Sequence, residues 1–168
     1  MDLTQSPVLW PSLIAEWQLS NVEVAYIDRQ QGLRCQDCGA NLRSMALAAA
    51  IMRCYGYKGL FRDFVVSHRA NRLRVLEINE AGSLTQYLGQ IPGHTLTTYP
   101  EVDMLSLPFS ENTFDIVVHS DTLEHVEDPI QALRECHRVL RSGGFCAFTV
   151  PLIVERRTIS RKGLSPSY

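Results

Sequence analysis

Residues 105–150 read LSLPFSENTFDIVVHSDTLEHVEDPIQALRECHRVLRSGGFCAFTV, and this stretch decides the fold. The run 114–119 is apolar and β-branched without alternation, which is typical of a strand buried on both faces of a parallel sheet. A second apolar run, 145–150, is expected to form the next strand. With a helix between them, the stretch predicts a right-handed βαβ unit.

The helix between these strands is expected to begin at Asp128-Pro129, because aspartate is a favoured N-cap and proline fits the first helical position. Glycine is typical just past a helix end, so Ser142-Gly143-Gly144 is expected to end it. Its predicted buried stripe consists of Ile130, Leu133, His137 and Leu140. His119, in the preceding strand, is expected in the core with a hydrogen bond to a backbone group.

The same stretch resembles the C-terminal half of a class I S-adenosylmethionine-dependent methyltransferase domain. The shared pattern is LPF, a polar turn, FD, an apolar strand, then LEHV, DP, RVLR and GG. This resemblance implies an α/β fold with a Rossmann-like, doubly wound, mostly parallel sheet. It also implies S-adenosylmethionine as methyl donor.

The first strand of such a sheet is expected over 73–79. In the family it runs into a glycine-rich turn, where the backbone approaches the amino acid part of the cofactor. This chain departs from that pattern, because Asn79-Glu80-Ala81-Gly82-Ser83 keeps a single glycine. Asparagine tolerates positive φ, so the turn is expected to persist. The resemblance implies that Asn79, Ala81 and Gly82 contact the cofactor.

Glu77 lies within that apolar first strand, where an acid is costly unless it is paired or used. In the family the matching acid lies beside the methionyl end of the cofactor, and the resemblance implies this role here. The alternative is that Glu77 only bonds the amides of the neighbouring loop.

A second strand is expected over 94–99. The chain then runs directly into the LPF motif, so a helix and a strand of the family pattern are missing or merged. Either Glu101 or Asp103 could be the acid that accepts hydrogen bonds from the ribose hydroxyls. The segment from Leu105 to Phe109 is expected to pack one face of the adenine, and the resemblance implies that Met104 also contacts the cofactor.

Ser120 and Asp121 follow the strand 114–119, at the end of a strand where doubly wound sheets bind ligands. We expect both to lie at the cofactor site. His125, in the LEHV motif, is the candidate catalytic base or substrate contact. The alternative for His125 is a surface histidine without a chemical role. His137, on the helix stripe, is expected to be structural.

Residues 1–72 are expected to form an N-terminal helical cap within the same domain, with helices near 21–31, 43–55 and 60–66. The α/β core is expected over 73–151. The segment 152–168 is expected to be a flexible or truncated tail, which would leave the sheet incomplete at its C-terminal edge.

Cys35-Gln36-Asp37-Cys38-Gly39 is a CxxCG turn, which can present two thiolates to zinc. A structural zinc site uses four ligands, and the sequence holds no second CxxC. The alternative is a pair of reduced cysteines in a packed turn. A zinc-binding interaction protein is accordingly one reading of the chain.

The composition favours a single cytoplasmic globular domain: 168 residues, a net charge of −2 and 45% hydrophobic residues. No run approaches the ~20 apolar residues that span a bilayer. The charge gives no case for nucleic acid. The resemblance implies a small-molecule, sugar or lipid acceptor, and the exposed edge of an incomplete sheet favours either a homodimer or a disordered tail. A non-catalytic methyltransferase-like binding module is the alternative function.

Overall fold

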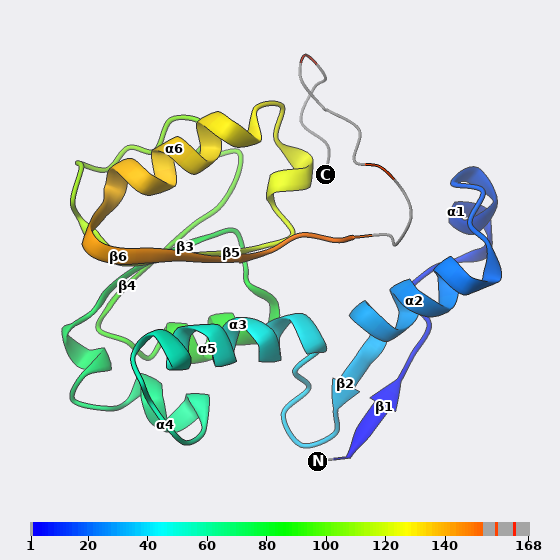
Figure 1. The fold of residues 1–168 in the computed structure, drawn as a ribbon, viewed down its shortest axis with the longest axis horizontal. Coiled ribbons are helices and arrows are strands. Elements are labelled where there is room, and N and C mark those ends of the chain that lie inside the picture. The colour runs from blue at the N-terminus through cyan, green and yellow to red at the C-terminus, as the bar shows by residue number, and fades with distance from the viewer. Residues whose placement is uncertain (1, 153–156, 158–162, 164–168) are drawn as a thin grey trace.

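The computed structural model describes residues 2–152, Arg157 and Gly163. Its centre is a parallel sheet with strand order β4-β3-β5-β6 (Figure 1). The strands are β3 (Arg74–Ile78), β4 (Gly93–Thr97), β5 (Phe114–Ser120) and β6 (Leu140–Thr149). Helices cover both faces of this sheet, which confirms the predicted Rossmann-like α/β fold.

Helix α6 (Pro129–Val139) covers one face of the sheet, and α3 (Leu42–Cys54), α4 (Phe61–Val65) and α5 (Thr85–Leu88) lie on the other (Figure 1). The remaining described elements precede α3 or are single turns. They are β1 (Leu3–Gln5), α1 (Pro11–Glu16), α2 (Asn21–Gly32), β2 (Leu33–Cys35) and the short 3₁₀ turns Ala70–Arg72, Gly82–Leu84 and Leu123–His125.

The helix starts follow local capping chemistry. Ser20 accepts a hydrogen bond from the Glu23 N–H, and the Glu23 side chain in turn accepts from the Ser20 backbone, so α2 begins with a capping box. Asp128 caps α6 by accepting from the Gln131 N–H at 2.9 Å. The predicted helices near 21–31, 43–55 and 60–66 are confirmed to within two residues. The antiparallel β1–β2 pair was not predicted, because strands of this length carry too little pattern.

Two apolar clusters lie on opposite faces of the sheet. Below it, the buried residues Leu47 and Ile51 of α3 pack with Val75 of β3 and Val118 of β5. Above it, buried residues of α6 pack against the opposite faces of β3 and β5. Helix α3 therefore supplies one layer of the domain core.

The α6–β6 junction differs from the prediction. The helix ends at Val139 and β6 begins at Leu140, before the glycines. The glycines are needed inside the strand, since a Cβ on Gly144 would lie 2.8 Å from the Asp115 carbonyl oxygen and Gly143 has φ +81°. The glycine signal was therefore a signal for close strand approach, not for a helix end.

The buried stripe of α6 was also predicted in the wrong register. The buried residues are Ala132, Cys136 and Val139, whereas Ile130 is 58% exposed and His137 is exposed. The buried positions repeat at i, i+4 and i+7 from Ala132, so the small and sulfur-containing side chains, rather than Ile130 and His137, meet the sheet. The prediction that His137 packs on this stripe was wrong.

His119 is fully buried, as predicted, but neither ring nitrogen has a hydrogen-bond partner among the described residues. The expected bond to a backbone group was therefore wrong. Its ring stacks on Phe148 of β6, with centroids 5.0 Å apart and an interplanar angle of 11°.

Residues 98–113 connect β4 to β5 without a helix or strand, which confirms the predicted gap. Because β3 pairs with both β4 and β5, the strand order reverses at β3. Among the described residues, no helix is long and apolar enough to cross a membrane. The predicted tail, 152–168, lies outside the described residues except for Leu152, Arg157 and Gly163.

Candidate functional site

A cavity of about 340 Å³ lies beyond the carboxyl ends of β3 and β5. In doubly wound sheets ligands bind at this edge, where the strand order reverses. Its walls come from three chain segments: the end of β3, the loop after β4 and the loop after β5. The lining residues are Ile78, Asn79, Tyr99, Val102, Asp103, Met104, Leu105, Thr122, His125, Val126 and Glu127.

The first wall is the turn after β3. Asn79 has φ +55°, which confirms that asparagine takes the left-handed conformation here. Its N–H donates to the Thr97 carbonyl at 2.7 Å, and its Oδ1 accepts from the Tyr99 N–H at 3.0 Å. Asn79 thus replaces a glycine while also fixing the start of the loop after β4.

Glu77 holds this turn from beneath and is fully buried. Its Oε1 accepts from the Ala81 N–H at 2.8 Å and from the Thr85 hydroxyl at 2.6 Å. Its Oε2 lies 2.7 Å from Nε2 of His94. Glu77 is not among the residues that line the cavity, and its contacts include the loop amide named in the alternative reading.

Two further predicted residues lie in the same turn, outside the cavity lining. Ala81 is fully buried, and Gly82 has φ +63°. A Cβ on Gly82 would lie 3.1 Å from Oγ of Ser44 in α3, so the glycine lets the turn and this helix approach closely. His94 was missed from the sequence, because its partner comes from a neighbouring strand.

The second wall is the loop after β4, which carries both candidate ribose acids. Asp103 lines the cavity, and its Oδ1 accepts from the Leu105 N–H at 2.8 Å. Glu101 is exposed and outside the lining, and its Oε2 accepts from the Thr98 hydroxyl at 3.3 Å. Met104 and Leu105 also line the cavity, whereas Leu107 is buried in the core.

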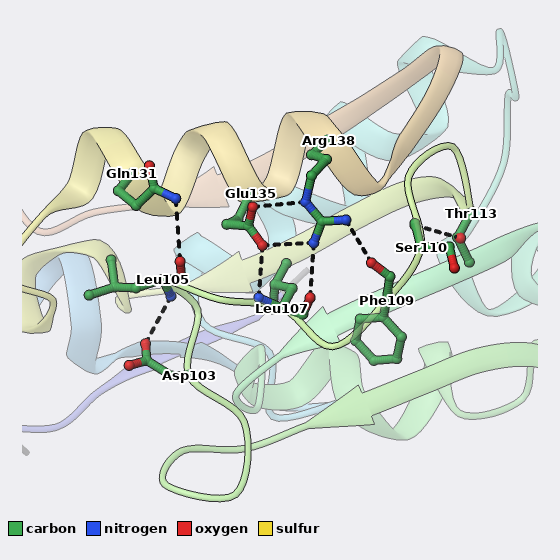
Figure 2. A network of polar contacts seen from close by, with 9 residues as sticks. All are labelled: Asp103, Leu105, Leu107, Phe109, Ser110, Thr113, Gln131, Glu135 and Arg138. Carbon is green, nitrogen blue, oxygen red and sulfur yellow. Dashed lines mark hydrogen bonds and ion pairs between the residues drawn. The ribbon is translucent and has the colours of Figure 1, made fainter.

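This loop is held from outside by a charged pair on α6 (Figure 2). Arg138 donates from Nη1 to the Phe109 carbonyl at 2.7 Å and from Nη2 to the Leu107 carbonyl at 2.9 Å. Glu135 accepts from the Leu107 N–H at 2.9 Å and pairs with Arg138 at 2.7 Å. The hydrogen bond from Arg138 lowers the pKa of Glu135.

Two weaker contacts extend this support. Gln131 of α6 donates to the Leu105 carbonyl at 3.4 Å (Figure 2). The Phe109 ring meets the Phe114 ring edge-on, with centroids 5.1 Å apart. The sequence shows both residues, Glu135 just before the RVLR motif and Arg138 as its first residue, but their role was not predicted. An i, i+3 charge pair is common on helices, and only the packed loop gives it this function.

The third wall follows β5. Thr122 and His125 line the cavity. Ser120 and Asp121 do not, since the Ser120 hydroxyl lies 2.8 Å from that of Thr149 and Asp121 forms an ion pair with Arg43 of α3. Asp121 has φ +49°, which turns the chain away from the strand. Burial raises the pKa of the neighbouring Glu124.

The two cysteines of the CxxCG turn differ in exposure. Cys35 is buried and Cys38 is exposed. The Gly39 N–H donates to the Cys35 carbonyl at 2.9 Å, and Gly39 has φ +69°, so the tight turn forms. Among the described residues, a cluster of three potential metal ligands lies elsewhere in the fold. Neither Cys35 nor Cys38 belongs to it.

The sheet and its helices define a doubly wound α/β domain, with a cavity at the edge where the strand order reverses. A family model described as a methyltransferase domain matches residues 61–148, from α4 to β6. This match covers more than half of the 168 residues. The chain therefore belongs to the class I S-adenosylmethionine-dependent methyltransferase family.

Curated relatives agree with this assignment. The chain is 27% identical over 100 residues to a demethylmenaquinone methyltransferase of Chlorobaculum tepidum, covering 48% of this chain and 41% of that protein. It is 51% identical over 39 residues to an uncharacterized methyltransferase of Schizosaccharomyces pombe, covering 23% and 14% of the two chains. The chain thus spans less than half the length of these relatives.

Solved structures were also matched. The carbon methyltransferase DszA aligns with a TM-score of 0.41 and 11% identity, covering 80% of this chain and 38% of that chain. The trans-methyltransferase CalH, in complex with SAH, aligns with a TM-score of 0.37 and 16% identity, covering 79% and 43%.

Proposed function

We propose that this domain transfers a methyl group from S-adenosylmethionine to a small-molecule, sugar or lipid acceptor, and that the cavity holds the adenosyl part of the donor. The observation that carries the proposal is the position of the cavity. In a chain of this family, a partly apolar hollow with two acids in its wall, Asp103 and Glu127, lies at the edge where doubly wound sheets bind nucleotides.

The residues of the second wall fit the adenosyl group. Met104 and Leu105 supply apolar surface for a flat base, and Asp103 supplies a carboxylate for the ribose hydroxyls. Because one oxygen of Asp103 accepts from the Leu105 N–H, the carboxylate is held in place. Asp103 is therefore proposed as the ribose acid in preference to Glu101.

The turn after β3 is proposed to carry the amino acid end of the donor. Asn79, Ala81 and Gly82 would bring backbone close to it, as the single remaining glycine allows. Glu77 would then act as a positioning residue, because its hydrogen bonds to Ala81, Thr85 and His94 fix the turn.

When bound, S-adenosylmethionine supplies a methyl group on a positively charged sulfur, which is already activated for transfer. The protein's task is to orient the acceptor and exclude water. His125 lies in the cavity wall on the short turn Leu123–His125, and it is proposed to hold or accept the acceptor's proton. Acceptors that lose a proton would need this group most.

Isothermal titration with S-adenosylhomocysteine tests the proposal. Asp103→Asn keeps an oxygen for the Leu105 N–H but removes the charge, and it is expected to weaken binding about tenfold, because a charge-assisted bond is lost. Glu101→Gln is the matched control and should bind like wild type. Absence of binding by the wild-type chain, or a loss confined to Glu101→Gln, would contradict the proposal.

A non-catalytic binding module is the second candidate, and the single glycine in the turn favours it. The double variant Asn79→Gly, Ala81→Gly distinguishes the two. If the native turn is competent, the variant should not bind S-adenosylhomocysteine more tightly than wild type. A large gain in affinity would support the module.

A further inference from the structure

Three side chains outside the cavity converge above the sheet. His119 lies on β5, Cys146 on β6 and Cys136 on α6. In the parallel ladder Cys146 is opposite Val117, so His119 and Cys146 share the face that α6 covers. Their potential ligand atoms all lie within 4.8 Å of one another.

The imidazole of His119 lacks the hydrogen bonds that a buried polar group normally makes. It is 0% exposed, and neither ring nitrogen has a hydrogen-bond partner within the part of the chain that the structure describes. Leaving such a group unpaired costs about 1–3 kcal/mol, so each case in a native protein calls for an explanation, such as a bound ion. The neutral imidazole is the form that coordinates metals.

The donor set is soft. Two thiols and an imidazole suit zinc and copper(I), and the group contains no carboxylate that would favour magnesium or calcium. With metal–sulfur bonds of about 2.3 Å, the sulfurs of a trigonal site lie about 4 Å apart. The observed cluster therefore needs to contract by less than about 1 Å to reach that geometry.

We propose that His119, Cys136 and Cys146 form a buried three-ligand site for a thiophilic d¹⁰ metal ion, either copper(I) or zinc, with zinc taking water as its fourth ligand. Binding releases the protons of the two thiols and involves no change in oxidation state. The site would tie β5, β6 and α6 together, beneath the loop that follows β5. It is independent of the proposed methyl transfer.

The metals themselves are the probes. Reduced, metal-free protein is titrated with Co²⁺, whose thiolate charge-transfer absorption reports sulfur ligation, then with Zn²⁺ in competition. A parallel titration uses copper(I) against a chromogenic chelator. Saturation near one equivalent by either ion supports the site and identifies the metal. No saturable binding of either ion would overturn the proposal.

Variants locate the site. Cys136→Ser, Cys146→Ser should lose this binding at least tenfold, whereas Cys35→Ser, Cys38→Ser, which changes the CxxCG turn, should retain it. The reverse pattern would overturn the proposal. X-ray absorption on metal-loaded wild-type protein keeps the test valid if a variant fails to fold. Two sulfur ligands and one nitrogen are expected, and a shell without sulfur would refute the site.

Discussion

The turn after β3 and the loop 102–110 form facing walls of one cavity, yet they are held in opposite ways. The turn is fixed by a buried acid beneath it, since Glu77 bonds Ala81, Thr85 and His94. The loop is fixed by Glu135 and Arg138, which form hydrogen bonds with its backbone from the partly exposed surface of α6.

This difference separates support from recognition. Glu77 makes its contacts within the protein, so its contribution to ligand binding passes through the turn. In the loop, backbone groups form hydrogen bonds with side chains of α6, whereas Asp103 and Leu105 line the cavity. Damage to the turn should therefore affect folding first, and damage to the loop should affect binding first.

Replacing Glu77 should have the largest effect. Glu77→Ala leaves the Ala81 N–H and His94 without their buried acceptor, so the free energy of unfolding should fall by about 2–4 kcal/mol. Denaturant unfolding measures this change. The adjacent exposed Glu80→Ala is the control and should stay within about 0.5 kcal/mol of wild type. Equal effects at both positions would contradict the assigned support.

Loosening the loop should act mainly on binding. Arg138→Ala removes the bonds to the Leu107 and Phe109 carbonyls, and S-adenosylhomocysteine affinity should fall about tenfold while stability falls by about 1–2 kcal/mol. Calorimetric titration and denaturant unfolding measure the two changes. Arg134→Ala, also on α6 and exposed, should change neither. A stability loss without any loss of affinity would refute the comparison.

The loop support should also be sensitive to acid. The folded-state pKa of Glu135 is lowered by its hydrogen bond from Arg138, so its stabilising contribution is present above the unfolded pKa of about 4.3. It is lost as pH falls further through the lowered folded value. The stability difference between wild type and Glu135→Gln should therefore shrink below about pH 4. A difference that grows in acid would have the wrong sign.

The smallest effect is expected at Asn79. Asn79 and Asn112 both have φ +55°, so glycine relieves the same backbone cost at each. Asn79 differs from Asn112 because its side-chain Oδ1 accepts a hydrogen bond from the Tyr99 N–H. Asn79→Gly should therefore be about 1 kcal/mol less favourable than Asn112→Gly in thermal or denaturant unfolding. Equal changes would show that this bond contributes nothing.

The βαβ unit, the parallel sheet and the missing elements between β4 and β5 could be predicted from sequence, because local apolar runs and breaks encode them. The end of α6 could not, since glycine serves both helix ends and close strand approach. The structure settles this ambiguity at Gly144, where the Asp115 carbonyl leaves no room for a side chain.

Part of the lining of the candidate cavity could also be predicted from the sequence. Asn79, Asp103, Met104, Leu105 and His125 line the cavity, as positions at strand ends should. The sequence did not predict that His94 on β4 pairs with Glu77, or that Arg138 forms hydrogen bonds with the loop backbone. Both depend on contacts between segments distant in sequence, which no local pattern records.

Hydrogen exchange with and without S-adenosylhomocysteine tests the central claim most directly. If the cavity holds the adenosyl group, ligand should slow amide exchange in 99–107 and 122–127, with weaker protection at 78–82. Another cavity is lined in part by Met45, Phe61 and Tyr87. Protection confined to that cavity would contradict the account, as would protection nowhere in the chain.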